Sequence, residues 1–273
     1  MEKEKIINIS AIQMNAEIAN KKANFEKVKK IVDRDIKENT DIIVLPEVWT
    51  VGWSPIHFRD SAEEIQTSET IDFLSNIARD CKSWVIGGSF ITKIDTHYYN
   101  TCPVLNRHGE LIATYSKNHL FSYYGSDEGK YVEVGTSPVM VDIEGVKTGL
   151  TICYDVRFPE IYRAYRKAGA DLLINCAAWG LKKPIPWECM TRCRAVENQS
   201  FMVALTQSGY IEDNEWNIGH SRIIDYKGDS IAEIKDQKEG VMSATLNFVP
   251  MYDFRNKCTC INDIRETYEV KKV

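Results

Sequence analysis

The sequence predicts an α/β protein whose chain forms two similar halves. In both halves, short segments rich in Val, Ile and Leu alternate with segments whose apolar residues recur at helical spacing. The chain has 273 residues, of which 44% are hydrophobic, enough for a large core. Sheets covered by helices would bury both kinds of segment. We expect a single domain over residues 1–273, because no linker-like composition divides the chain.

The first half follows the order strand, helix, strand. Residues 6–14 and 42–46 have the composition of strands, and the Lys-rich segment between them has apolar residues at helical spacing. A second helix is predicted over residues 70–80, and residues 84–91 (WVIGGSFI) are predicted to form one buried strand. The turn at residues 106–109 (NRHG) then predicts a β-hairpin.

The second half begins with two strands, PVMVDI and KTGLTICY, on either side of Glu144 and Gly145. A helix is predicted from Pro159 to Gly169, because Pro is favoured at the first helical position and Gly just after the last. The same order then repeats, with a strand at 171–179, a helix at 187–198, a strand in SFMVALTQ and a hairpin over 221–234 that turns at Lys227 and Gly228.

The segment GLTICYDVRFPE (residues 149–160) places Cys153 between an apolar strand and the helix that opens with Pro159. Free N–H groups at a helix start can lower the pKa of a thiol and stabilise negative charge on a carbonyl that the thiol attacks. Cys153 is therefore the candidate nucleophile. The alternative is a buried cysteine that acts as a small hydrophobic side chain, which is common for free cysteines.

Two further apolar runs end at a charged residue. The segment DIIVLPEVW leads to Glu47, and LIATYSKNHLF leads to Lys117. Functional groups often lie at the carboxyl ends of strands in α/β proteins, so we expect a carboxylate, an ammonium and a thiol to converge. Glu47 would accept the thiol proton and Lys117 would stabilise an oxyanion. Taken singly, each is more typical of a solvated charge at a strand end.

The motifs LPEVW, YSKNHLF and CYDVRFPE, in this order, resemble the nitrilase-like carbon-nitrogen hydrolases. Residues 192–204 (RCRAVENQSFMVA) and 219–233 (GHSRIIDYKGDSIAE) resemble the same family, so the resemblance covers nearly the whole chain. It implies a four-layer αββα sandwich and a catalytic set of Glu47, Lys117 and Cys153.

The resemblance also implies a Glu in the loop after the lysine, which helps to position the substrate and Lys117. In the loop FSYYGSDEGKYVEVG, Glu128 is the better match. The adjacent Asp127 takes its place if the loop is shifted by one residue. A polar turn with no part in the site is the other interpretation.

The implied reaction is the hydrolysis of a small carboxylic-acid amide to the acid and ammonia through a thioester on Cys153. Glu47 would act as base and then as acid. Lys117 and the backbone N–H of Tyr154 would stabilise the oxyanion. This chemistry requires only proton transfer and a thiolate, so no cofactor and no metal is implied.

The motif CYDVRFPE is closest to the omega-amidases of 2-oxo acid amides and the deaminated-glutathione amidases. An N-carbamoyl amine hydrolase and a nitrilase of the same fold remain alternatives, as does a catalytically idle protein that binds a metabolite or a partner. Arg157 is a candidate contact for a substrate carboxylate, or else forms a structural salt bridge. Trp179 and Trp49 are candidates for the walls of the substrate pocket, with core packing as the equal alternative.

Composition limits the partners. The net charge of −5 gives no reason to expect nucleic acid or an anionic membrane, and no run approaches the length of a membrane span. The eight cysteines show no compact disulfide framework. A zinc site is not expected, because the pair Cys189/Cys193 falls on a predicted helix and the pair Cys258/Cys260 is closer than usual zinc spacing. We expect reduced thiols, a cytoplasmic location, and a small-molecule amide as substrate. The family resemblance further implies a homodimer or larger homo-oligomer, with residues 250–273 as a tail that packs on a neighbouring subunit.

Overall fold

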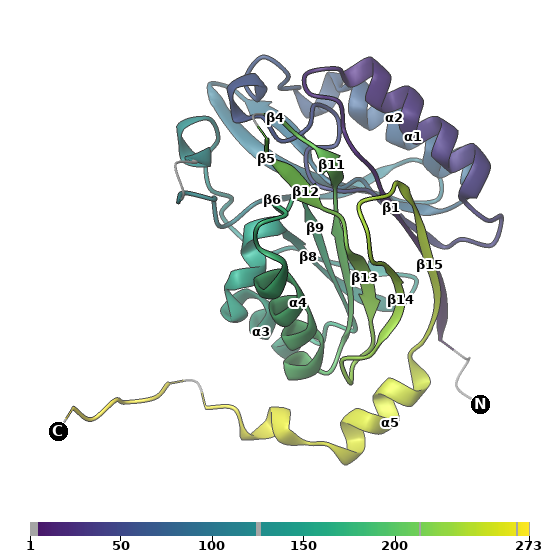
Figure 1. The fold of residues 1–273 in the computed structure, drawn as a ribbon. Coiled ribbons are helices and arrows are strands. Elements are labelled where there is room, and N and C mark those ends of the chain that lie inside the picture. Colours follow the sequence, from purple (N-terminus) through teal and green to yellow (C-terminus); the bar gives the residue numbers. More distant parts are fainter. Residues whose placement is uncertain (1–4, 124–126, 213, 266, 273) are drawn as a thin grey trace.

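The computed structural model describes residues 5–123, 127–212, 214–265 and 267–272. Within these residues, two large β-sheets face each other and helices cover the outer face of each sheet (Figure 1). The α/β prediction and the four-layer αββα sandwich are both confirmed.

The first sheet combines strands of the first half with one strand from near the end of the chain. Its strands are β1 (Ile6–Gln13), β2 (Ile42–Val44), β3 (Trp84–Ile86), β4 (Phe90–Ile94), β5 (His97–Leu105), β6 (Leu111–Ser116) and β15 (Gly240–Asn247). Their order is β15-β1-β2-β3-β5-β4, with β6 paired to β5 as the predicted hairpin. The sequence did not reveal β15, which pairs with the full length of β1 in antiparallel register.

The second sheet contains only strands of the second half. They are β7 (Met140–Ile143), β8 (Val146–Ile152), β9 (Leu172–Ala177), β10 (Phe201–Thr206), β13 (Ser221–Ile224) and β14 (Ser230–Ile234). Their order is β14-β13-β10-β9-β8-β7, and β8, β9 and β10 are parallel. A small separate hairpin of β11 (Ser208–Tyr210) and β12 (Trp216–Ile218) follows β10.

Helices α1 (Lys21–Asp35) and α2 (Glu69–Cys81) pack against the first sheet, and α3 (Pro159–Lys167) and α4 (Pro184–Asn198) cover the second (Figure 1). The first two begin at side-chain caps, because Asn20 accepts a hydrogen bond from the Ala23 N–H and Ser68 from the Ile71 N–H. The other two begin at a proline, whose missing N–H costs nothing at this position.

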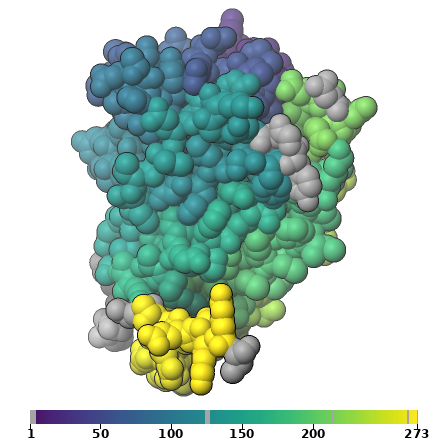
Figure 2. Space-filling view, turned by 90° about the vertical axis from the view of Figure 1, so that its left-hand side faces the viewer, coloured from purple at the N-terminus to yellow at the C-terminus, as the bar shows by residue number. Residues whose placement is uncertain are grey.

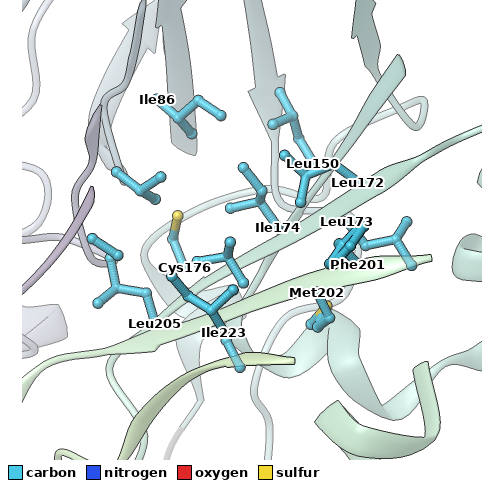
Figure 3. Packing of buried hydrophobic residues seen from close by; sticks show 14 of the residues in the cluster. Ile86, Leu150, Leu172, Leu173, Ile174, Cys176, Phe201, Met202, Leu205 and Ile223 are labelled. Carbon is cyan, nitrogen blue, oxygen red and sulfur yellow. The ribbon is translucent and has the colours of Figure 1, made fainter. Parts of the chain in front are cut away.

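The main core lies between the two sheets. Figure 3 shows Ile86 of the first sheet together with Leu150 and Ile174 of the second, all buried in one cluster. Each fully buried side chain of this size stabilises the fold by about 1.5–3 kcal/mol. A second cluster lies between the first sheet and its helices, and it includes Val28, Ile31 and Leu74. The apolar residues that recur at strand and helical spacing in the sequence are therefore the ones that these two clusters bury.

Residues 84–91 do not form the one strand that the sequence predicts. The chain leaves the ladder after β3, and β4 begins only at Phe90. Gly88 lies between them in the left-handed region at φ +64°, and a Cβ there would be 2.0 Å from the carbonyl oxygen of Pro46. Because the strand is broken here, the backbone at Gly88 can pass directly beside Pro46, the residue that precedes Glu47. In addition, α4 begins at Pro184, three residues before the predicted start.

The C-terminal segment begins with α5 (Val249–Lys257) and a short turn, η5 (Cys260–Asp263). It lies at one end of the molecule (Figures 1 and 2), and its last part extends away from the sandwich (Figure 1). Residues 266 and 273 of the predicted tail lie outside the described residues. Among the helices described, each is too short or too polar to span a bilayer.

Candidate functional site

Four side chains from separate segments meet at one end of the two sheets. Glu47 follows β2, Lys117 follows β6, Glu128 opens the turn η3 (Glu128–Lys130), and Cys153 opens the turn η4 (Cys153–Arg157) directly after β8. The Lys117 ammonium donates to Glu47 Oε1 at 2.8 Å and to Glu128 Oε2 at 2.9 Å. The side chains of all three are completely buried. The charges of Glu47, Lys117 and Glu128 all act on the nearby Cys153 thiol, so the structure brings together the four residues that the sequence predicted.

The carboxylate of Glu47 is held by further donors. The Ala178 backbone N–H donates to Oε2 at 2.8 Å, and Asn100 Nδ2 donates to Oε1 at 2.9 Å. Asn100 also donates to Glu128 Oε1 at 3.2 Å, so one amide bridges the two carboxylates. Sequence reasoning missed Asn100, because β5 also contains His97 and Thr101 and nothing local distinguishes Asn100 from these polar residues.

The choice between Glu128 and Asp127 is settled geometrically. The Phe121 N–H donates to Glu128 Oε2 at 2.8 Å, which ties the loop after Lys117 back to this carboxylate. Asp127 instead lies 3.6 Å from Lys130, and its side chain is 44% exposed. Glu128 is the residue beside Lys117.

Cys153 lies at a strained turn. Its φ is +45°, which is rare for a residue with a side chain and is maintained here by the strand before it and the turn after it. The residue as a whole is 7% exposed, and its thiol lies 3.9 Å from the Ala178 carbonyl oxygen. Tyr154, as the second residue of η4, has a backbone N–H of the kind that finds no acceptor within a helix start.

The charges of the cluster shift its proton affinities. Burial raises the pKa of Glu47, and the neighbouring Glu128 carboxylate adds to this, while Lys117 partly opposes it. Burial alone would lower the pKa of Lys117, but Glu128 and Glu47 outweigh it and the pKa is raised. Lys117 is thus a permanent cation between two carboxylates.

The prediction of a lowered thiol pKa is wrong. Burial and the Glu47 carboxylate raise the pKa of Cys153 well above its ordinary value, and the nearby Lys117 only partly offsets them. The resting thiol is therefore protonated, and its proton must be taken by a neighbouring base at the moment of attack.

The thiol opens into a cavity of about 550 Å³. Aromatic rings form much of its lining, from residues Trp53, Phe121, Tyr123, Tyr154 and Trp179. Lys182, Lys183 and Glu215 also line it. Trp53, which sequence reasoning missed, has its ring centre 5.0 Å from the Lys117 ammonium. An apolar cavity with a few charged groups is typical of a site for a small organic molecule.

Two residues with open alternatives are now placed. Trp179 lines the cavity, whereas Trp49 is fully buried and donates from Nε1 to the Gly87 carbonyl at 2.8 Å, so Trp49 belongs to the core. The Arg157 guanidinium lies over the ring of Trp179 at 5.1 Å and over that of Tyr154 at 5.7 Å. Within the described residues it forms no salt bridge, and its buried Nε has no hydrogen-bond partner.

The described residues bring no group of His, Cys, Asp and Glu side chains into an arrangement that could hold a metal ion. Their eight cysteines are all free thiols.

The chain matches the family model described as carbon-nitrogen hydrolase over residues 8–256. A 2-oxoglutaramate amidase of Paenarthrobacter nicotinovorans is 38% identical over 234 residues, 82% of this chain and 78% of that protein. A 2-oxoglutaramate amidase of Bacillus subtilis (strain 168) is 31% identical over 258 residues, 94% of this chain and 97% of that protein. The crystal structure of Saccharomyces cerevisiae Nit3, a member of branch 10 of the nitrilase superfamily, is 28% identical with a TM-score of 0.85, over 93% of this chain and 94% of that one.

These similarities extend across both sheets and include every segment that contributes to the cluster around Lys117. They confirm the resemblance drawn from the three motifs and the predicted class of enzyme, a hydrolase of carbon-nitrogen bonds other than peptide bonds. The chain belongs to the carbon-nitrogen hydrolase family.

Proposed function

We propose that this protein is a thiol-dependent amidase that hydrolyses the amide of a small 2-oxo carboxylic acid to the acid and ammonia. The observation that carries the proposal is the convergence of the Cys153 thiol with Glu47, Lys117 and Glu128 beside an aromatic-lined cavity. Such a cluster contains a nucleophile, a base and a fixed positive charge, which together suffice for acyl transfer.

In the first half-reaction, Glu47 accepts the thiol proton while Cys153 Sγ attacks the amide carbon. The raised pKa of Glu47 suits this step, because a base of higher pKa takes a proton more readily. The oxygen of the tetrahedral intermediate would lie between the Lys117 ammonium and the Tyr154 N–H. Glu47 then returns the proton to the nitrogen, the C–N bond breaks and ammonia leaves a thioester on Cys153.

In the second half-reaction, Glu47 removes a proton from a water molecule that attacks the thioester carbon. The C–S bond breaks, the thiolate regains the proton from Glu47, and the carboxylic acid is released. Lys117 stabilises the second oxyanion as it did the first. Glu128 keeps the ammonium in place through both half-reactions, since it accepts from Nζ with both oxygens, at 3.1 Å and 2.9 Å.

The charges around the cavity support an acidic substrate. The Arg157 guanidinium lies over rings that line the cavity, and no carboxylate of the described residues neutralises it. Burial, together with the positive charge of Arg157, lowers the pKa of Lys183 in the lining. A substrate carboxylate would be attracted to both groups. The names of the two bacterial relatives, both 2-oxoglutaramate amidases, support the same substrate class.

The test is ammonia release from 2-oxoglutaramate, 2-oxosuccinamate, simple aliphatic amides, N-carbamoyl amines and nitriles. We expect turnover of the 2-oxo acid amides by the wild type, none by Cys153→Ala, and wild-type turnover by Cys189→Ala, which removes an exposed thiol. Activity confined to carbamoyl compounds or nitriles would refute the substrate class. Silence across the whole panel would favour a protein that binds a metabolite without turning it over.

We further propose that the whole chain is one domain, that it works in the cytoplasm, and that it forms a homodimer or larger assembly. The free thiols support a reducing compartment. Ile185 on α4 is 70% exposed and Val196 on the same helix is 46% exposed, which suits a contact with another copy. The described residues 267–272 are all exposed and would pack on a neighbouring subunit. Light scattering at micromolar concentration that returns the mass of one chain would contradict the assembly.

A further inference from the structure

We propose that Asp155 is a positioning residue that holds the Lys117 segment and the Cys153 turn in one fixed geometry. The inference rests on the proposed roles of Lys117 and Cys153. It adds a further residue, which has no part in the proposed reaction steps. Asp155 is fully buried in η4, two residues after Cys153. It does not line the substrate cavity, and the Cys153 thiol faces the Ala178 carbonyl oxygen rather than the Asp155 carboxylate.

The Asp155 carboxylate accepts four hydrogen bonds. Oδ2 accepts from the Tyr115 hydroxyl at 2.6 Å and from the Ile152 N–H at 2.9 Å. Oδ1 accepts from the backbone N–H of His119 at 2.9 Å and from its ring Nδ1 at 2.8 Å. Four donors on two oxygens occupy the full acceptor capacity of an ionised carboxylate on the sides that face the protein.

The donors bracket Lys117. Tyr115 lies two residues before it, at the end of β6, and His119 lies two residues after it. The Tyr115 hydroxyl also accepts from the Asn118 N–H at 3.3 Å. Tyr115, Asn118 and His119 are therefore attached, directly or through one hydroxyl, to the same carboxylate.

The same carboxylate is attached to the nucleophile. The Ile152 N–H belongs to the residue just before Cys153, so the bond to Oδ2 closes the turn in which Cys153 has φ +45°. The His119 ring stacks on Phe158, just after η4, at 3.7 Å and an angle of 10°. Asp155 thus stabilises a strained backbone and ties it to the loop that carries the ammonium.

This arrangement has a consequence for the chemistry. Lys117 and Cys153 come from different sheets, so their separation is not set by any one element of secondary structure. A displacement of about 1 Å between reacting groups commonly lowers the rate about 100-fold. A carboxylate shared by the two backbones keeps that separation constant, and an amide in its place would present an N–H₂ group to two of the donors.

The test compares Asp155→Asn with Asp171→Asn. Asp171 is also a buried carboxylate with several donors, Arg255, Lys5 and Tyr252, but it lies away from the cavity. We expect Asp155→Asn to lower kcat about 100-fold with KM within about threefold of wild type. Asp171→Asn should lower the melting temperature and leave kcat unchanged.

The second readout requires no substrate. The rate at which iodoacetamide alkylates Cys153 is followed against pH by mass spectrometry of the Cys153 peptide. We expect Asp155→Asn to move this profile to higher pH, because the ammonium that favours the thiolate is displaced, and Asp171→Asn to leave it unchanged. If Asp155→Asn does not fold, Tyr115→Phe removes one of the four donors and should shift the profile in the same direction.

A wild-type kcat and alkylation profile in the folded Asp155→Asn protein would overturn the inference. So would a change in stability alone, as in Asp171→Asn. Failure of the proposed function is distinguishable, because it would appear as turnover that survives Cys153→Ala, whereas failure of this inference leaves turnover dependent on Cys153.

Discussion

Replacing Glu128 by Gln removes one negative charge from the buried cluster and keeps its shape. Glu128 now accepts from the Lys117 ammonium, the Asn100 amide and the Phe121 N–H. A Gln has one acceptor oxygen, so its N–H₂ group would face at least one of these donors. Hydrogen bonds to charged groups each contribute about 1.5–3 kcal/mol, and the loss of one should lower the melting temperature by roughly 3–12 °C.

The same change predicts a shift in the pH dependence. Glu128 helps to raise the pKa of Glu47, so its removal lowers that pKa. Glu47 must be deprotonated to accept the thiol proton, and activity therefore rises as the pH increases through its pKa. In Glu128→Gln the acid limb of kcat/KM moves to lower pH. At the plateau, kcat falls about 100-fold, because Lys117 is less well held and Glu47 is a weaker base.

The assay is ammonia release from the best substrate of the panel, measured across the acidic and neutral range. Asp127→Asn is the matched control, because this neighbouring carboxylate is 44% exposed and forms an ion pair with Lys130 at the surface rather than with the buried cluster. We expect it to retain wild-type kcat and an unchanged acid limb. A Glu128→Gln enzyme with kcat within threefold of wild type, or with its acid limb moved to higher pH, would refute the reasoning.

Three further predictions follow from the same contacts. Lys117→Met should lower kcat about 100 to 1000-fold as an oxyanion donor is lost, and steady-state kinetics that show a smaller loss would argue against that role. Gly88→Ala should destabilise the protein by about 1–3 kcal/mol or more, because its Cβ would meet the Pro46 carbonyl at 2.0 Å; an unchanged melting temperature would contradict this. Burial acts to raise the pKa of Glu63, but hydrogen bonds from Lys21, Ser68 and Thr70 outweigh it and the pKa is lowered. The contribution of Glu63 to stability is therefore present above its unfolded pKa and is lost as the pH falls through its folded pKa. In Glu63→Gln the melting temperature should fall less steeply as the pH is lowered in the acidic range. A slope equal to that of the wild type would count against this prediction.

The sequence was informative where one short segment contains the whole signal. Cys153, Glu47 and Lys117 each follow an apolar run, so their place at strand ends was predictable without knowing the fold. Helices α1 to α4 were predictable for the same reason, since their apolar faces are local, whereas α5 was not predicted.

Features that depend on distant segments were not predictable. β15 pairs with β1 although more than two hundred residues separate them, and nothing in its own composition indicates that partner. Asn100 and Asp155 look like ordinary polar residues until the fold brings the Glu47 and Tyr115 side chains against them. The direction of the Cys153 pKa shift was mistaken because a helix start is visible in sequence, whereas burial beside a carboxylate is not.

Acid-quenched mass spectrometry during turnover tests the central claim most directly. The wild-type enzyme is mixed with 2-oxoglutaramate, quenched at short times and digested, and the peptide that contains Cys153 is examined. The account predicts an adduct on Cys153 equal to the acid product minus water, which appears before steady state and disappears when the substrate is exhausted. Ammonia release at the full rate with an unmodified Cys153 peptide at every quench time would contradict it.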